Sequence, residues 1–326
     1  ELSADVLAQA IFDGNKAMLA KAITLLESTK PAHFEKANAV IEKCLAQPNK
    51  SIRLGITGVP GVGKSSFIET LGKTLTDQGN KVAVLAVDPT SSLSKGSILG
   101  DKTRMETLAK DQNAFIRPSP SGTSLGGVAR KTRESIILCE AAGYNVILVE
   151  TVGVGQSEIA VHSMVDFFLL LKLSGAGDEL QGIKRGIMEM ADAIAINKAD
   201  GSNLEHAKLA VSEFSRALHL YPPKANGWTP KVMKCSAVQN TGIEDIWKMV
   251  QQFVEHTKEN GFFEKNRKQQ NKNWFLQTVD EYIKQFFHQK ENFKKEQAKL
   301  LTEIEEHKIS PFYAAKILLD KITEEL

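Results

Sequence analysis

A glycine-rich run that ends in lysine and serine carries the clearest chemistry of this sequence. Gly58 to Ser65 reads Gly-Val-Pro-Gly-Val-Gly-Lys-Ser and fits the pattern GxxxxGK[ST]. It lies between an apolar run, Ile52 to Thr57, and a segment of helical periodicity that opens at Ser65, which is the context that the motif requires. In such a loop the backbone N–H groups surround the β-phosphate, Lys64 neutralises the β and γ oxygens, and Ser65 offers its hydroxyl to Mg²⁺. The run therefore predicts a site for a magnesium-bound nucleoside triphosphate.

A second motif predicts which base the nucleotide carries. Asn197-Lys198-Ala199-Asp200 follows the apolar run Ala193 to Ile196 and fits the pattern NKxD. The Asp200 carboxylate can accept hydrogen bonds from N1–H and the N2 amine of guanine, whereas adenine lacks both donors. The loop Cys235-Ser236-Ala237 ends the next apolar run, where related proteins place backbone N–H groups on guanine O6. Together the two loops predict GTP as the nucleotide.

Carboxylates near the ends of predicted strands are candidates for the magnesium site. Glu150 follows the apolar run Asn145 to Val149, at the position where P-loop proteins carry an acidic residue for Mg²⁺. Glu is longer than the commoner Asp and can act through a water, which Mg²⁺ readily retains. Asp88 closes the run Val82 to Val87, and Asp101 precedes a predicted helix. A strand-end turn residue for Asp88 and a plain N-cap for Asp101 remain the alternatives.

The residues after Glu150 predict slow hydrolysis. In many regulatory GTPases a Gln directly after the next glycine orients the attacking water, but here that position is Val154. The missing stabilisation would come from a partner or from the segment Gly175 to Gly186. That segment has glycines that permit movement, and Lys184 and Arg185 to supply charge. A solvated basic loop is the other interpretation of this segment.

Apolar runs rich in β-branched residues alternate with helix-length segments through the middle of the chain. Strands joined in this way predict βαβ units and a mainly parallel sheet with helices on both faces, which is an α/β fold. The expected strands are Ile52 to Thr57, Val82 to Val87, Ala114 to Ile116, Asn145 to Val149, Phe167 to Lys172, Ala193 to Ile196 and Lys231 to Cys235.

Only helical periodicity is found before and after that alternation. We expect a helical N-terminal extension over residues 1–50, a P-loop nucleotide-binding domain over 51–257 and a helical C-terminal arm over 258–326. Aromatic residues recur along the arm, which favours a packing or dimerisation surface over a cofactor site.

Composition excludes several classes of protein. The 326 residues include 41 Lys and Arg against 39 Asp and Glu, so no overall positive charge favours nucleic acid or an anionic membrane. Three scattered cysteines form neither a disulfide framework nor a zinc motif, and a reducing cytoplasm is expected. No apolar run is long enough to span a bilayer, and Glu1 to Leu26 lacks the pattern of a secretory signal.

Five motifs occur in order along the chain: Gly58 to Ser66, Asp88 to Ser92, Gly96 to Met105, Glu150 to Glu158 and Asn197 to Asp200. Together they resemble the MeaB/ArgK GTPases, which are chaperones of cobalamin-dependent acyl-CoA mutases, chiefly methylmalonyl-CoA mutase. Some members carry the older label of LAO/AO (lysine/arginine/ornithine) transport ATPase or kinase. The resemblance covers about residues 15–250 and extends to the arm only in its helical character. It implies a SIMIBI-class P-loop fold, with a C-terminal arm that forms a homodimer.

The resemblance also implies the site residues. In the family, GTP hydrolysis gates the delivery of adenosylcobalamin and the ejection of damaged cofactor, which belongs to the mutase. Gly175 to Gly186 would be a third switch that contacts the mutase and brings Lys184 or Gln181 toward the nucleotide, beside the catalytic Lys64 and Glu150. Mg²⁺ is expected near Ser65, Asp88, Asp101 and Glu150. GTP or GDP is expected at Gly58, Val59, Pro60, Gly61, Val62, Gly63, Lys64, Ser65, Ser66, Asn197, Lys198, Asp200, Cys235, Ser236 and Ala237.

Three other functions remain open. A nickel-insertion GTPase for urease or hydrogenase has the same class of fold, but such proteins tend to carry His-rich tracts, and the seven histidines here are dispersed. A kinase that phosphorylates a transport protein conflicts with the guanine-selecting Asp200 and with the lack of an export signal. A binding module without turnover remains compatible with Val154.

Overall fold

The computed structural model describes residues 2–28, 30–47, 50–87, 105–118, 125–151, 157–174 and 185–323. The chain divides into two compact units, Glu1–Arg267 and Lys268–Leu326. Among the described residues, no helix combines the length and the apolar character needed to cross a membrane.

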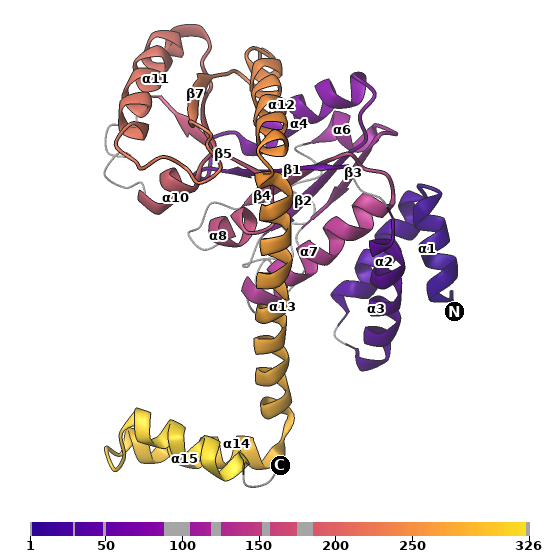
Figure 1. The fold of residues 1–326 in the computed structure, drawn as a ribbon, viewed down its shortest axis with the longest axis vertical. Coiled ribbons are helices and arrows are strands. Elements are labelled where there is room, and N and C mark those ends of the chain that lie inside the picture. Colours follow the sequence, from indigo (N-terminus) through magenta and orange to yellow (C-terminus); the bar gives the residue numbers. More distant parts are fainter. Residues whose placement is uncertain are drawn as a thin grey trace. The chain divides into compact units, whose positions relative to one another are not determined.

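The first unit is built on a parallel sheet (Figure 1). In the described part of the chain the sheet has seven strands in the order β3-β2-β4-β1-β5-β6-β7, and every neighbouring pair is parallel. All of the predicted strands are present within two residues of their expected ends, so the predicted α/β fold is confirmed. The strands are β1 (Ile52–Thr57), β2 (Val82–Val87), β3 (Ala114–Arg117), β4 (Val146–Thr151), β5 (Phe167–Leu173), β6 (Ala193–Asn197) and β7 (Lys231–Lys234).

Alternating side chains of the strands pack on two helical layers, because successive residues of a strand point to opposite faces of the sheet. Leu169 and Leu171 of β5 belong to the core that contains residues of α4 (Lys64–Asp77), α6 (Glu106–Lys110) and α12 (Ile243–Glu259). Leu170 between them packs with residues of α10 (Arg185–Met190) and α11 (Leu204–Leu218). The second face is completed by α7 (Leu125–Ala141) and α8 (Ser157–His162), which contact each other and the sheet.

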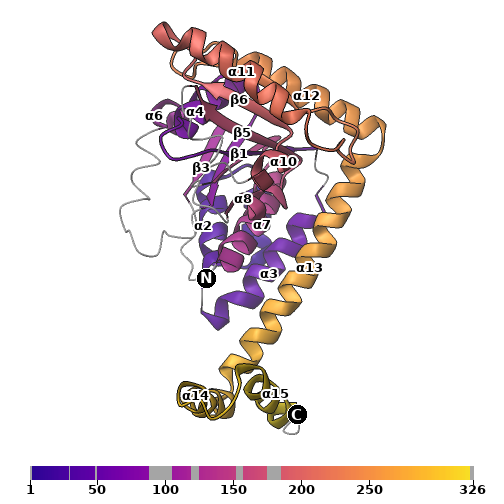
Figure 2. The same cartoon turned by 90° about the vertical axis from the view of Figure 1, so that its left-hand side faces the viewer.

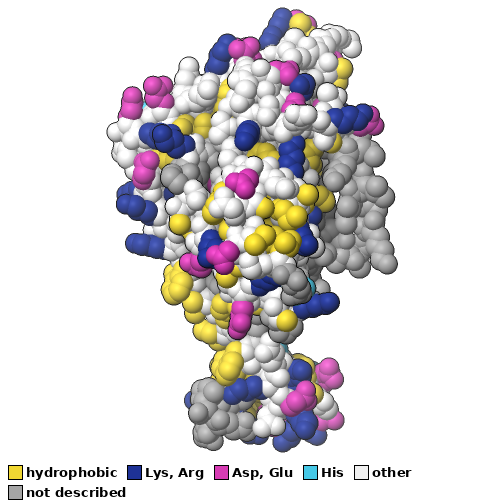
Figure 3. Space-filling view, turned by 90° about the vertical axis from the view of Figure 1, so that its right-hand side faces the viewer, with side chains coloured by type: hydrophobic (Ala, Val, Ile, Leu, Met, Phe, Trp, Pro, Cys, Tyr) yellow, Lys and Arg dark blue, Asp and Glu magenta, His cyan; other side chains and the backbone are white. Residues whose placement is uncertain are grey.

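The N-terminal extension is helical, as expected. It consists of α1 (Ala4–Phe12), α2 (Lys16–Glu27) and α3 (Pro31–Leu45), which pack on one another and on α7 (Figure 2). Arg117 of the edge strand β3 forms an ion pair with Glu27 of α2. Hydrophobic side chains gather on the face of the first unit that carries these helices (Figure 3), and Val6 and Phe34 are exposed.

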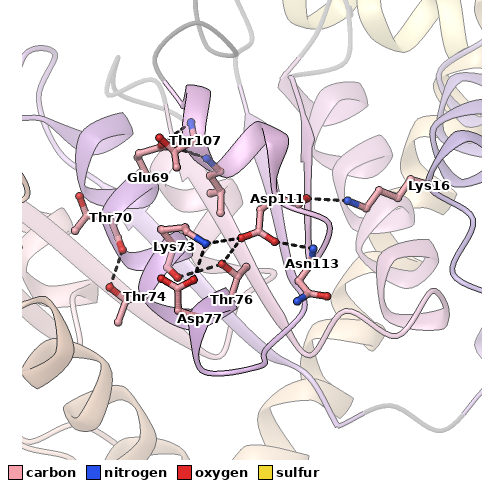
Figure 4. Close-up of polar contacts among 11 residues, drawn as sticks. Lys16, Glu69, Thr70, Lys73, Thr74, Thr76, Asp77, Thr107, Asp111 and Asn113 are labelled. Carbon is pink, nitrogen blue, oxygen red and sulfur yellow. Dashed lines mark hydrogen bonds and ion pairs between the residues drawn. The ribbon is translucent and has the colours of Figure 1, made fainter.

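A carboxylate network ties α4 to its neighbours (Figure 4). Asp111 accepts hydrogen bonds from Asn113 N at 2.8 Å, Lys73 Nζ at 2.9 Å and Thr76 Oγ1 at 2.7 Å. These donors, the Asn113 amide first, lower the pKa of Asp111 to about 2. The backbone oxygen of Asp111 accepts from Lys16 Nζ of α2 at 2.9 Å. Asp111 therefore links α4, the helix that follows the glycine-rich run, to α2 of the N-terminal extension.

The start of β5 is held by a buried ion pair. The Asp166 side chain is only 1% exposed and accepts from Arg267 Nε at 2.8 Å and Nη2 at 2.7 Å. The backbone N–H of Arg53 also donates to Asp166 Oδ2, at 2.8 Å. Arg267 lies in α13 (Phe262–Gln289), so this pair secures the first turns of that helix within the first unit.

Arg267→Met is expected to destabilise the first unit by about 3–5 kcal/mol, because it leaves the Asp166 carboxylate buried without its cation. Urea denaturation followed by circular dichroism measures the change. The double variant Arg267→Met/Asp166→Asn is the matched control and should recover part of the loss, since the amide carries no charge to bury. A single variant within about 0.5 kcal/mol of the unaltered protein would contradict this assignment.

The described residues of the second unit form helices joined by short turns, which confirms the predicted helical character of the arm. It contains the remainder of α13, together with α14 (Glu291–Glu305) and α15 (Pro311–Thr323). The last two helices contact each other, and Lys321 of α15 forms an ion pair with Glu296 of α14. The limits expected for the three domains remain predictions.

Candidate functional site

The loop from β1 to α4 has a backbone that its glycines make possible. Gly61 and Gly63 have φ values of 81° and 94°, in the left-handed region that favours glycine. A Cβ atom at Gly63 would lie 2.7 Å from Asn197 Nδ2, so a side chain there would displace a neighbouring loop. Because α4 begins at Lys64, the N–H groups of its first turn lack partners within the helix and can bind an anion.

Lys64 is held inside this loop. Its side chain donates from Nζ to Gly58 O at 2.7 Å and to Val59 O at 3.3 Å, and the residue is 8% exposed. Burial lowers the pKa of Lys64, while the negative charges of Glu150 and Glu158 oppose that shift. The loop therefore combines the backbone N–H groups at the start of α4 with a cation that can exchange its carbonyl partners for phosphate oxygens.

Ser65 and Glu150 lie together at the end of the central strands. Ser65 Oγ is 3.5 Å from Glu150 Oε1. Next to Glu150, Thr151 Oγ1 donates to Thr57 Oγ1 at 2.8 Å, which joins the ends of β4 and β1. A hydroxyl and a carboxylate are oxygen ligands of the kind that Mg²⁺ prefers, so this pair fits a magnesium ion that keeps waters and phosphate oxygens as its other ligands.

Asn197 connects the glycine-rich loop with the loop after β7. It is 1% exposed, and its Nδ2 donates to Val62 O at 2.9 Å. Its Oδ1 accepts from Ala237 N at 3.3 Å and from Cys235 Sγ at 3.6 Å. Next to it, Lys198 has a φ of 58° and donates from Nζ to Gly61 O at 2.9 Å. One buried amide thus joins two loops that are far apart in the sequence.

The Asp200 carboxylate is oriented by the same loop. Asp200 Oδ2 accepts a hydrogen bond from Ser236 Oγ, and Ser236 Oγ accepts one from Gln239 N at 3.1 Å. Thr70 Oγ1 of α4 donates to Ala237 O at 2.8 Å and fixes this loop to the helix. Cys235 is buried, and burial raises the pKa of its thiol to about 12, so Cys235 stays a neutral structural residue at physiological pH.

The contacts bring several expected site residues to the same edge of the sheet. The residues joined by these bonds come from the ends of β1, β4, β6 and β7, because parallel strands place their carboxyl ends at one edge. Four expected residues, and the position that predicts slow hydrolysis, lie outside the described residues, and their roles remain predictions. These are Asp88, Asp101, Gln181 and Lys184, with Val154.

Two residues near the site were not predicted from the sequence. Glu158 is 3% exposed, and its negative charge opposes the lowering of the Lys64 pKa by burial, although in the sequence it stands out only as the last residue of the motif Glu150 to Glu158. Asn203 contacts Lys198 and Ser174, and no motif marks it. The bond between Asn203 and Ser174 has no sequence signal, because it joins residues 29 positions apart that the neighbouring strands β5 and β6 bring together.

The arrangement can hold a magnesium-bound nucleotide. Backbone donors, a buried ammonium and a hydroxyl–carboxylate pair suit phosphates and Mg²⁺. A carboxylate fixed by a serine hydroxyl suits a base with two adjacent donors.

Comparison with known proteins identifies the family. The model of the family described as methylmalonyl-CoA mutase-associated GTPase MeaB matches residues 19–292. A probable GTPase of Mycobacterium tuberculosis is 46% identical over 97% of this chain and 94% of its own length. GTPase ArgK of Escherichia coli is 44% identical over 91% of this chain and 90% of its own.

Two further relatives agree with this result. The mitochondrial methylmalonic aciduria type A homolog of Mus musculus is 43% identical over 97% of this chain and 78% of its own length. The crystal structure of an LAO/AO transport system kinase covers 98% of this chain and 97% of its own, with a TM-score of 0.78 and 36% identity. Since the family model matches most of the chain and its relatives are similar along nearly all of it, the chain belongs to the MeaB family of GTPases.

Proposed function

We propose that this protein binds GTP with Mg²⁺, hydrolyses it slowly and gates the loading of adenosylcobalamin into a cobalamin-dependent acyl-CoA mutase of the methylmalonyl-CoA mutase type. The observation that carries the nucleotide assignment is the joined set of loops in which Asn197 bonds both Val62 O and Ala237 N. The mutase assignment is supported by the description of the family and by the name of the mouse relative.

The phosphate end of the site uses residues from Gly58 to Ser66. On binding, Lys64 Nζ exchanges Gly58 O and Val59 O for oxygens of the β- and γ-phosphates, which compensate its charge better than neutral carbonyls do. Ser65 and Glu150 would hold Mg²⁺, directly or through a water, together with Asp88 and Asp101. The ion, when bound, neutralises charge on the phosphate oxygens.

The base end uses Asn197, Lys198 and Asp200 with the loop Cys235-Ser236-Ala237. The Asp200 carboxylate would accept from N1–H and the N2 amine of guanine while Ser236 Oγ keeps it oriented. Ala237 N lies 3.3 Å from Asn197 Oδ1, a long bond whose N–H guanine O6 can share. Lys198 would cover one face of the base, since its side chain already reaches Gly61 O.

The isolated protein is expected to hydrolyse GTP slowly, and the rate of hydrolysis is expected to rise at least about tenfold when a methylmalonyl-CoA mutase from the same source is added. The reason is that no Gln occupies position 154, so charge stabilisation has to come from Lys184, Gln181 or the partner. Phosphate release measured with and without mutase tests this, with Lys184→Ala and Gln181→Ala expected to lose the stimulation. An unrelated acyl-CoA enzyme is the control. Unstimulated hydrolysis in the presence of bound mutase would contradict the gating role and leave the GTPase activity standing.

A homodimer formed through the second unit is part of the proposal, as is a cytoplasmic location. Phe275, Leu276, Ile283 and Phe286 of α13 are exposed at spacings that place them along one side of the helix. An apolar stripe of this kind on an otherwise charged helix supports pairing with a second copy.

A further inference from the structure

Asn203 is the last residue of the short 3-10 helix η1 (Gly201–Asn203), which continues directly into α11. Its backbone is helical, with φ −88° and ψ −4°, so its side chain is not placed to accept a bond from a backbone N–H of the first turn of α11, as a capping Asn would. In α11, all of whose residues are described, its side chain makes no such bond. Instead, Nδ2 donates to Lys198 O at 2.7 Å, and Oδ1 accepts from Ser174 Oγ at 2.7 Å.

The first of these bonds holds a backbone that is unusual for its residue type. Lys198 has a φ of 58°, which few residues other than glycine adopt without local support. The carbonyl group of Lys198 can only accept a hydrogen bond, so it is the Nδ2 group of Asn203 that must face it. The direction of the chain at Lys198 decides where Asp200, two residues later, presents its carboxylate.

The second bond connects this loop to the neighbouring strand. Leu173 at the end of β5 pairs with Asn197 at the end of β6, and Ser174 is the next residue of the chain. Asn203 therefore bridges the ends of two adjacent strands. Its orientation is fixed at both ends of the amide, since Ser174 Oγ occupies the acceptor and Lys198 O the donor.

We propose that Asn203 is a positioning residue for guanine recognition. It holds the carbonyl of Lys198, and so it fixes the direction of Asp200 without contacting the nucleotide itself. The inference deepens the proposed function and rests on Asp200 being the carboxylate that selects guanine.

Asn203→Asp tests the donor bond in the full-length protein. The substitution keeps the shape and the acceptor for Ser174 but replaces the Nδ2 donor with an oxygen that repels Lys198 O. The affinity for GDP, measured by titration calorimetry, is expected to fall roughly tenfold or more. The affinity for inosine diphosphate should fall less, because inosine lacks the N2 amine that Asp200 accepts from. The preference for GDP over inosine diphosphate is therefore expected to shrink toward one.

Asn15→Asp is the matched control. Asn15 is an N-cap, and its side chain accepts from Met18 N at 3.1 Å, a role that Asp fills equally well. This variant should keep the preference of the unaltered protein. Asn203→Ala removes the donor without adding a charge and is used if Asn203→Asp does not fold, with the same loss of preference expected.

Two results separate failure of this inference from failure of the proposed function. Suppose that the unaltered protein prefers GDP, and that both substitutions at Asn203 keep that preference or lower the affinities for GDP and inosine diphosphate by the same factor. Asn203 then has only a structural role. If the unaltered protein itself fails to prefer GDP over inosine diphosphate and ADP, the guanine assignment of Asp200 is wrong, and the inference falls with it.

Discussion

Asp200→Asn is expected to change the preferred nucleotide from GTP to xanthosine triphosphate. Xanthine carries an oxygen where guanine carries its N2 amine, and an Asn amide offers a donor to that oxygen while its own oxygen still accepts from N1–H. With guanine, the new donor would face the N2 amine, and two donors cannot pair. The affinity for GTP should fall about 100-fold or more, since a site built for a hydrogen bond rejects a base that cannot complete it.

Competition binding with GTP, xanthosine triphosphate and ATP measures this change. The variant should fold normally, because an Asn oxygen at position 200 can still accept from Ser236 Oγ. Asp245→Asn, on the exposed face of α12, is the matched control and should keep the preference for GTP. Unchanged GTP affinity in Asp200→Asn would show that another group recognises the base.

Lys64→Met is expected to lower the rate of GTP hydrolysis at least about 100-fold, because it removes the buried cation that is proposed to neutralise the phosphates. Met has a similar length and no charge, so the variant leaves the volume of the site nearly unchanged. It also removes a positive charge close to Glu150 and Glu158, which should lower the affinity for GTP more than that for GDP, since GTP carries the additional phosphate.

Single-turnover hydrolysis and the affinities for GTP and GDP test this expectation. Lys208→Met on α11 is the control, since its ion pair with Glu205 is exposed and contributes little. Circular dichroism establishes that both variants fold. Hydrolysis by Lys64→Met at a rate close to that of the unaltered protein would contradict the assignment of the glycine-rich loop.

Local patterns predicted the strands and the position of the glycine-rich loop well. Strands of a parallel sheet are buried on both faces, so they appear as short, continuous apolar runs, and those of β1 and β2 end where the sequence predicts. The left-handed glycines Gly61 and Gly63 also belong to the motif itself. Such features depend on residues within a few positions of one another, which is the range that periodicity and motif spacing describe.

Periodicity and motif spacing do not predict contacts between residues that are far apart in the sequence. Asn197 and Val62 are 135 residues apart in the sequence, and they meet because β5 lies between β1 and β6 in the sheet. Nothing local to either strand specifies this order. The same holds for Asp111, which joins α2 and α4, and for Asp166, which is buried by Arg267 from 101 positions away.

The sequence by itself determined the α/β class, the glycine-rich loop and the identity of the residues proposed to bind the base, because each depends on side-chain type at short spacing. Only the tertiary structure decided which partners orient those residues. Lys64 donates a hydrogen bond to Gly58 O, Asp200 accepts one from Ser236, and the backbone oxygen of Lys198 accepts one from Asn203. Gly58 and Asn203 are near their partners in the sequence, whereas Ser236 comes from the loop after β7. The sheet brings Ser236 to Asp200 because β6 and β7 are neighbours and their carboxyl ends lie at the same edge.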